Sequence, residues 1–137
     1  MKSILLDTNI ILDIALRREP HFYHSSKLFR LFDEKLIEGY ITATTLTDIY
    51  YIARKEKTRN AAKNFIRDLI KIVEVLGVDK EVIQDALSSN IDDFEDAVQV
   101  FSAEHHEIKT IVTRNKKDFR KSGLEILTPK ELIQQIT

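Results

Sequence analysis

The sequence predicts an α/β protein, a three-layer α/β/α sandwich with a mostly parallel five-stranded sheet, in a single domain over residues 1–137. The main observation is that short apolar segments alternate with longer segments of helical periodicity, as in proteins built from βαβ units. The composition agrees, because 43% of the residues are hydrophobic, which suits a folded core and not a disordered chain. No internal repeat or linker divides the chain.

Five segments are expected to form the strands. Ser3–Leu6 is a short apolar run that ends at Asp7, which is typical of a buried strand. Thr110–Thr113 is the clearest strand of the chain. The other three are expected at Tyr40–Ala43, at Val75–Val78 with Gly77 inside it, and at Glu125–Leu127.

Helices are expected between the strands, because apolar residues recur there at the spacing of one helical face. The first helix follows Asp7–Asn9, which can cap it. The second begins at Pro20, buries Leu36 near its end and is stopped by Gly39. Further helices are expected around Leu46–Ala53, Thr58–Val73, Asp79–Leu87 and Asp92–His106, and after Thr128-Pro129.

Composition excludes several classes of function. The chain has no cysteine, which excludes disulfides, thiolate zinc sites, iron–sulfur clusters and a cysteine nucleophile. With three glycines and no G-x-G-x-x-G after a strand, dinucleotide binding is disfavoured. Apolar runs such as Ile10–Leu12 are too short to cross a bilayer, and no charged-then-apolar leader precedes the first strand. We therefore expect a soluble, cytoplasmic protein with no membrane partner.

Charge is segregated along the chain, although the net charge is only −1. Residues 79–96 hold seven acids and one base, whereas residues 109–121 hold six bases and one acid. Solvated helix faces explain any single run of this kind. Together the two runs are also the pattern of a metal site beside a phosphate-binding surface.

Acidic residues from four segments are expected at one edge of the sheet, because ligands of open parallel sheets bind outside the carboxyl ends of the strands. Taken singly, each acid has an ordinary role as a helix cap, a first-turn acid or a turn residue. Their shared edge favours a site. The acids are Asp7 after the first strand, Asp48 early in the helix after the second, Asp93 and Asp96 at the start of the helix before Thr110, and Asp118 after that strand.

Such crowded carboxylates repel one another and raise each other's pKa unless a cation lies between them. Oxygen ligands without cysteine favour Mg²⁺ or Mn²⁺, and one or two such ions support phosphodiester hydrolysis. Neighbouring residues are suited to orient water or a phosphate (Thr8, Asn9, Thr113 and Asn115) or to bind flanking phosphates (Arg114, Lys116 and Lys117).

His21 and His24 lie three residues apart on the second predicted helix, a spacing that a metal pair can use. With no acidic partner predicted nearby, a surface helix is the preferred interpretation.

Four short motifs, in this order and spread over nearly the whole chain, resemble those of the PIN-domain nucleases. This family includes the VapC-type toxins of bacterial toxin–antitoxin pairs. The motifs are Leu5-Leu6-Asp7-Thr8-Asn9, Thr44–Asp48 ahead of Ile49-Tyr50, Asp93-Phe94-Glu95-Asp96-Ala97, and Thr113-Arg114-Asn115-Lys116-Lys117-Asp118-Phe119.

The resemblance implies a metal-dependent endoribonuclease on a five-stranded parallel sheet, with RNA as substrate, a protein antitoxin as partner and, in many members, a homodimer. Asp7, Asp96 and Asp118 match acidic metal-site positions of the family. Asp48 stands where the family usually has glutamate, so its shorter side chain reaches the metal directly or through a water. Asp93 is an additional acid on the face of Asp96. The residues that match polar positions of the site are Thr8, Asn9, Thr113 and Asn115.

Two other functions stay open at this point. The aspartate at position 48 is compatible with an inactive PIN-like module that binds RNA or a protein. A phosphotransfer domain of similar architecture fits less well. A haloacid-dehalogenase-like phosphatase needs a second aspartate where the chain has Asn9, and a response-regulator receiver needs an acidic pair beside the first strand that Asp7-Thr8 does not supply.

Overall fold

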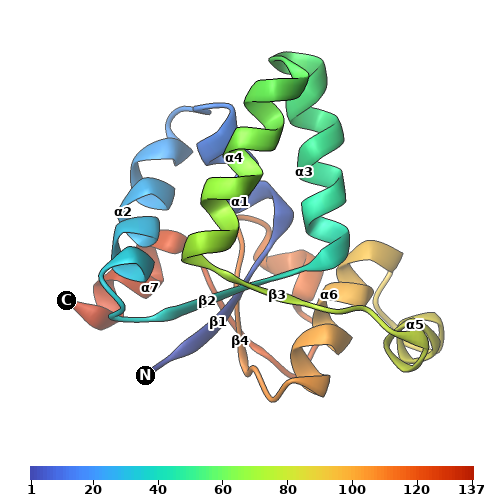
Figure 1. The fold of residues 1–137 in the computed structure, drawn as a ribbon. Coiled ribbons are helices and arrows are strands. Elements are labelled where there is room, and N and C mark those ends of the chain that lie inside the picture. The colour runs from blue at the N-terminus through green and yellow to red at the C-terminus, as the bar shows by residue number, and fades with distance from the viewer.

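The computed structural model describes residues 1–137, and it confirms the predicted parallel sheet between two layers of helices (Figure 1). None of the helices combines the length and the apolar character needed to cross a bilayer. The elements, in chain order, are β1 (Ser3–Leu6), α1 (Thr8–Ala15), α2 (His21–Asp33), β2 (Glu38–Thr42), α3 (Ala43–Glu56), α4 (Arg59–Ile72), β3 (Glu74–Leu76), α5 (Lys80–Leu87), α6 (Phe94–His105), β4 (Thr110–Val112), the 3₁₀ helix η1 (Lys116–Phe119), β5 (Glu125–Leu127) and α7 (Pro129–Ile136).

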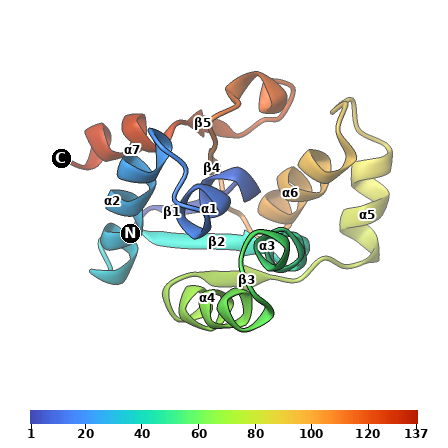
Figure 2. The same cartoon turned by 90° about the horizontal axis from the view of Figure 1, so that it is seen from above.

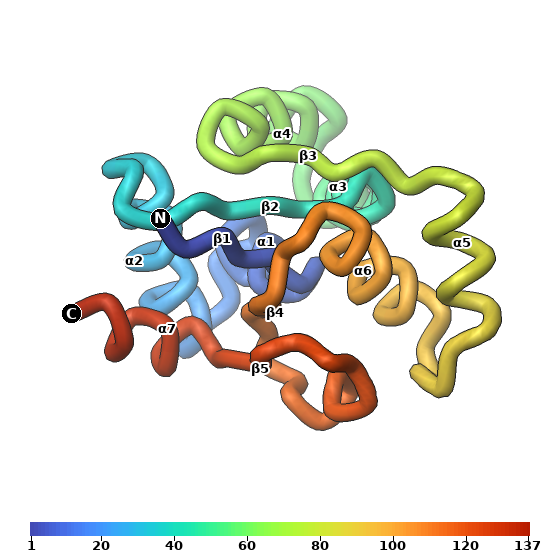
Figure 3. Tube along the Cα trace, turned by 90° about the horizontal axis from the view of Figure 1, so that it is seen from below, coloured from blue at the N-terminus to red at the C-terminus, as the bar shows by residue number.

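The strands lie in the order β3-β2-β1-β4-β5, and all four neighbouring pairs are parallel (Figure 3). From β1 the chain first builds outward through β2 and β3, and then returns to the other side of β1 to form β4 and β5. The order therefore reverses between β1 and β4, which makes the gap between their carboxyl ends the topological switch point of the sheet. In β1, Leu5 pairs with both Tyr40 of β2 and Ile111 of β4.

The sheet buries both faces because successive side chains of a strand point to opposite sides. In β1, Ile4 and Leu6 belong to a cluster of 15 buried apolar residues with α1, α2, α3, α4 and α7. Leu5 belongs to a separate cluster of seven on the other face, with α6 and η1. Figure 2 shows the resulting arrangement from above, with α5 packed beside α6 at one end.

The side-chain cap predicted for the first helix is absent, because Asp7 is the N-cap of α1 but makes no cap hydrogen bond with its side chain. Several other helices begin with a hydroxyl or carboxylate oxygen that accepts a backbone N–H. Thr42 caps α3, Thr58 caps α4 and Asp79 caps α5. Thr128 begins α7 with a complete capping box to Glu131. These capping hydrogen bonds fix the residue at which each helix begins, and therefore the position of its first turn relative to the sheet.

The prediction that Gly39 stops the second helix is wrong. Helix α2 ends at Asp33, Leu36 is 54% exposed, and Gly39 lies inside β2. A Cβ atom on Gly39 would lie 3.0 Å from Cε2 and Cζ of the Phe32 ring, which is buried in the core. The residue is glycine because the Phe32 ring packs closely against the strand, and not because a helix ends there.

Replacing Gly39 with valine is expected to lower the free energy of unfolding by about 2 kcal/mol, because the added methyl groups must displace the Phe32 ring in a packed core. Urea denaturation measures this change. Gly77→Ala is the matched control, since no atom lies within 4 Å of the added Cβ, and it should be neutral or slightly stabilising. Equal destabilisation by both substitutions would contradict this explanation.

Candidate active site

Asp7 occupies the switch point as the first residue after β1, and only 5% of it is exposed. Its Oδ2 accepts a hydrogen bond from Thr113 Oγ1 at 2.8 Å, and its Oδ1 accepts one from Gln99 Nε2 at 3.1 Å. The backbone N–H of Asp7 donates to the Val112 carbonyl at 3.0 Å, which extends the β1–β4 pairing. Burial raises the pKa of Asp7 above its usual value even though these hydrogen bonds lower it.

Threonine hydroxyls hold the loops around Asp7. Thr113 is fully buried at the end of β4, and its Oγ1 also accepts the backbone N–H of Asn115 at 3.0 Å. On the opposite side, the Thr8 and Thr45 hydroxyls lie 2.9 Å apart and join the first turn of α1 to the first turn of α3. The predicted polar residues Thr8 and Thr113 thus fix the ends of three elements against one another.

Helix α6 brings two of the predicted acids to this edge. Asp93 is its N-cap, and its Oδ1 accepts the backbone N–H of Asp96 at 2.9 Å. The Asp96 side chain is half-buried. Burial raises the pKa of Asp96 to about 7, and the negative charges of Asp93, Asp7 and Asp118 add to that shift. Carboxylates from β1, α6 and η1 are therefore close enough to repel one another.

Glu95 is a member of the cluster that the sequence analysis did not single out. The neighbouring carboxyl group of Asp48 on α3 raises the pKa of Glu95 to about 8, with further contributions from burial and from the charges of Asp93 and Asp96. The sequence carries a signal for it, because Glu95 lies between two predicted acids in the same first turn. Only the packing of α6 against α3 shows that it faces Asp48.

Two adjoining cavities contain the predicted acids. One of about 370 Å³ is lined by Asp7, Asp48, Asp93, Glu95 and Asp96, together with Thr8, Asn9 and Gln99. The next, of about 470 Å³, is lined by Asp93, Asp96 and Asp118, together with the basic residues Lys117, Arg120 and Lys121. Asp93 and Asp96 line both cavities, so all five predicted acids border one continuous depression.

Arg114 and Lys116, two of the residues predicted to bind phosphate, form ion pairs outside the acidic depression. Arg114 forms a bidentate ion pair with the fully buried Asp13 of α1, at 2.7 and 3.2 Å. Lys116 Nζ donates to both carboxylate oxygens of Glu131 on α7, at 3.0 and 3.2 Å. Asn115 contributes its backbone N–H to the loop and makes no side-chain hydrogen bond to the acids. The bases that do line the acidic depression lie further along η1 and beyond it.

The donors around Asp7 suit a hard divalent cation such as Mg²⁺, since every candidate ligand is an oxygen. No three Asp, Glu or His side chains form a ready-made cage for an ion in this structure. Mg²⁺ does not need one, because it keeps several waters and takes one or two protein carboxylates. Gln99 Oε1 is buried and has no hydrogen-bond partner, although its amide nitrogen bonds to Asp7. An acceptor left free beside repelling carboxylates fits a bound hydrated cation.

Comparisons with known proteins identify the family and the fold. The sequence matches the PIN domain family over residues 3–117. Among curated proteins no significant match is found.

Solved structures match the fold over almost the whole chain. VapBC2 from Rickettsia felis, bound to a DNA fragment from its promoter, has a TM-score of 0.71 at 18% identity, over 92% of this chain and 98% of that one. DNA-bound VapBC from Salmonella typhimurium has a TM-score of 0.69 at 21% identity, over 94% and 99%. VapC20 from Mycobacterium tuberculosis, a sarcin-ricin loop cleaving toxin, has a TM-score of 0.64 at 16% identity, over 80% and 87%.

At these identities the solved structures establish a shared fold, and the family match, which spans 115 of the 137 residues from position 3 to position 117, establishes kinship in sequence. The acidic depression lies at the carboxyl edge of the sheet, where the strand order reverses between β1 and β4. The chain belongs to the PIN-domain family, whose nucleases generally use divalent metal ions.

Proposed function

We propose that this protein is a metal-dependent endoribonuclease that hydrolyses RNA phosphodiester bonds with Mg²⁺ or Mn²⁺. Asp7, Asp48, Asp96 and Asp118 are its catalytic carboxylates. The observation that carries the proposal is the gathering of Asp7, Asp48, Asp93, Asp96 and Asp118 around two adjoining cavities at the switch point of the sheet. Charges of one sign gathered where ligands of α/β sheets bind are typical of a cation site.

Asp7, Asp96 and Asp118 are the residues that would hold the ion. When bound, such an ion supplies positive charge that favours deprotonation of water and stabilises charge on phosphoryl oxygens. Asp7 is the fixed member, because Gln99 and Thr113 hold both of its carboxylate oxygens. Asp96 and Asp118 are more exposed and are free to turn toward the ion.

Asp48 acts at the periphery of this site. Its carboxyl group lies beside Glu95, whose pKa it raises, so it would contact a water of the hydrated ion more readily than the ion itself. Hydrolysis requires that the attacking water lose a proton and that the leaving ribose oxygen gain one. Asp48 and Glu95 line the same cavity as Asp7, where such a water would be bound.

RNA as substrate is supported by the bases beside the acids and by the described activity of VapC20 on the sarcin-ricin loop. Lys117, Arg120 and Lys121 line the cavity of Asp118, where they can contact phosphates on either side of the cleaved bond. A toxin role with an antitoxin partner is supported by structures such as a toxin–antitoxin complex from Klebsiella pneumoniae, with a TM-score of 0.69 at 20% identity, over 93% of this chain and 98% of that one.

A second candidate function is an inactive module that binds RNA or a protein. The observation that favours it is the engagement of the short Asp48 side chain with Glu95, in a site without a preformed metal cage. Isothermal calorimetry with Mn²⁺ separates the two functions, since the inactive module has no cation site that depends on Asp7 and Asp96.

Asp7→Asn is expected to lower RNA cleavage in Mn²⁺ or Mg²⁺ by about 10²–10³-fold, the usual effect of removing one essential charged group from a preorganised site. Cleavage of a labelled RNA measures it, with EDTA as the metal-free reference. Asp68→Asn, on the exposed face of α4, is the matched control and should retain full activity. Circular dichroism should show both variants folded. Undiminished cleavage by Asp7→Asn would reject the assignment of the catalytic carboxylates.

The metal-free protein is expected to lose stability as the pH rises from about 4 to about 8. Asp96 and Glu95 have raised pKa values in the folded state, so the folded state binds more protons than the unfolded state across this range, and unfolding becomes easier as these protons leave. Millimolar Mg²⁺ should restore the melting temperature near the upper end of this pH range and have little effect near the lower end.

Asp96→Asn should flatten this pH dependence. Because it removes a repelled charge, it should raise the melting temperature of the metal-free protein at high pH by about 4 °C, equivalent to about 1 kcal/mol after solvent screening is allowed for. The same variant should lose cleavage activity. A lower melting temperature in Asp96→Asn would show that the carboxylates do not repel one another.

A further inference from the structure

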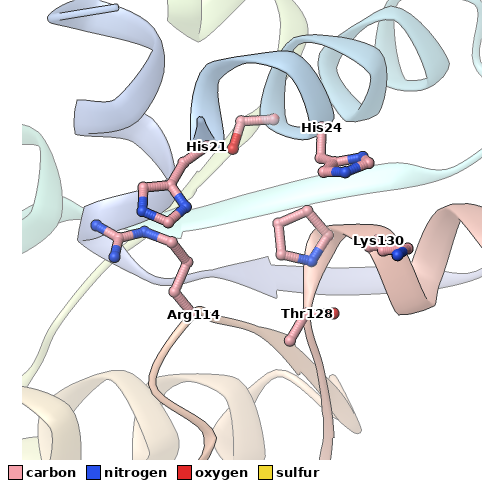
Figure 4. A pocket seen from close by; sticks show the side chains of 7 residues that line it. His21, His24, Arg114, Thr128 and Lys130 are labelled. Carbon is pink, nitrogen blue, oxygen red and sulfur yellow. The ribbon is translucent and has the colours of Figure 1, made fainter. Parts of the chain in front are cut away.

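A third cavity at the carboxyl edge of the sheet has the opposite charge. It measures about 250 Å³ and is lined by seven residues, none of which is acidic. Figure 4 shows His21, His24, Arg114, Thr128 and Lys130 arranged around it. We refer to it as the basic pocket, and the proposed catalytic carboxylates do not line it.

Three elements that are distant in sequence form the basic pocket. His21, His24 and Ser25 lie in the first two turns of α2, Arg114 follows β4, and Thr128–Lys130 begin α7 directly after β5. The ends of β4 and β5 place the pocket beside the acidic depression. The N-termini of α2 and α7 both face it, and the partial positive charge of a helix N-terminus favours an anion.

Hydrogen-bond donors in the basic pocket are left without partners inside the protein. Ser25 is 1% exposed, and its Oγ has no hydrogen-bond partner. Arg114 donates to Asp13 through Nε and Nη2, which leaves Nη1 unpaired. Thr128 Oγ1 accepts the backbone N–H of Glu131, so its own O–H is still free to donate. Buried polar groups are normally satisfied, so an unpaired hydroxyl in a cationic cavity indicates a ligand.

The geometry points to one backbone phosphate of the RNA substrate as the ligand of the basic pocket, and this inference rests on the proposed nuclease function. Thr113 and Arg114 are consecutive residues that face opposite ways. Thr113 donates to Asp7 in the acidic site, and Arg114 lines the basic pocket. An RNA strand whose cleaved bond lies over the acids therefore has a neighbouring phosphate within reach of the pocket.

A phosphate fits this arrangement better than a carboxylate from a protein partner. The donors approach from α2, from the residue after β4 and from the start of α7. A phosphodiester and a carboxylate each offer two charged oxygens, so position decides between them: Arg114 directly follows Thr113, which donates to Asp7, and the pocket is therefore next to the site proposed to bind RNA. The ion pair with Asp13 holds the Arg114 guanidinium in place, so the phosphate meets a positioned donor.

The inference is tested first with inorganic phosphate in EDTA. Side-chain ¹⁵N–¹H spectra should show shifts of the His21 and His24 ring signals as phosphate is added. In the Lys130→Gln variant these shifts should be smaller at the same phosphate concentration. Arg114 is left intact, because its removal would strand the buried charge of Asp13. Absence of any phosphate-dependent shift in the wild-type protein would overturn the inference.

Binding of a fluorescent single-stranded RNA is then measured in EDTA over a range of salt concentrations. The double variant His24→Gln/Lys130→Gln should reduce the slope of log Kd against log salt by about 0.7, the share of one phosphate contact in a single strand. Lys71→Gln, which removes one exposed charge near the amino ends of the strands, should leave the slope unchanged.

Two results would contradict the assignment of an RNA phosphate to the basic pocket. An unchanged slope in the double variant would mean that the pocket binds an anion other than RNA, and displacement of phosphate by polyglutamate but not by RNA would assign it to a protein partner. Failure of the proposed function is a separate result, because the double variant would then still reduce the slope while the wild-type protein shows no cleavage in Mn²⁺.

Discussion

The buried Asp7 carboxylate organises this protein. It lies where the strand order of the sheet reverses, between β1 and β4. Asp7 follows the central strand β1, and its position next to β4 is set by the Asp7–Val112 backbone hydrogen bond. Burying a charged group is unfavourable unless hydrogen bonds compensate it. Gln99 of α6 and Thr113 at the end of β4 supply them, and so tie the central strands to the helix that carries Asp96. The hydrogen bonds that offset the cost of burying the Asp7 carboxylate also orient it toward the acidic depression.

Charges of opposite sign are separated over a very short distance in this fold. The loop after β4 sends Thr113 toward Asp7 and Arg114 toward Asp13, so the acidic site lies on one side of the loop and the Arg114–Asp13 ion pair on the other. Burial, together with the charges of Asp93, Asp7 and Asp118, raises the pKa of Asp96. Such a conflict destabilises the fold locally, and proteins retain conflicts of this kind at functional sites. In the proposed function, a divalent cation and a polyanionic substrate relieve both charges at once.

Structural and functional roles coincide at several of these positions. Asp93, which the sequence predicts in the first turn of α6, is its N-cap, and its charge also contributes to the raised pKa of Asp96. Thr113 closes the loop after β4 and also donates to Asp7. A capping role therefore does not argue against a place in the site, because the cap lies at the helix N-terminus and the helix N-termini point to the edge where ligands bind.

The local pattern of the sequence was sufficient for the order of strands and helices and for the convergence of Asp7, Asp96 and Asp118. Apolar periodicity determines which segments form strands, and a parallel sheet brings their carboxyl ends to one edge. Periodicity says nothing about which side chains meet. Contacts between elements placed Gly39 under the Phe32 ring, turned Glu95 to Asp48 and paired Arg114 with Asp13. These pairs depend on how elements pack across the sheet, and packing is decided by the shape and charge of residues far apart in the chain.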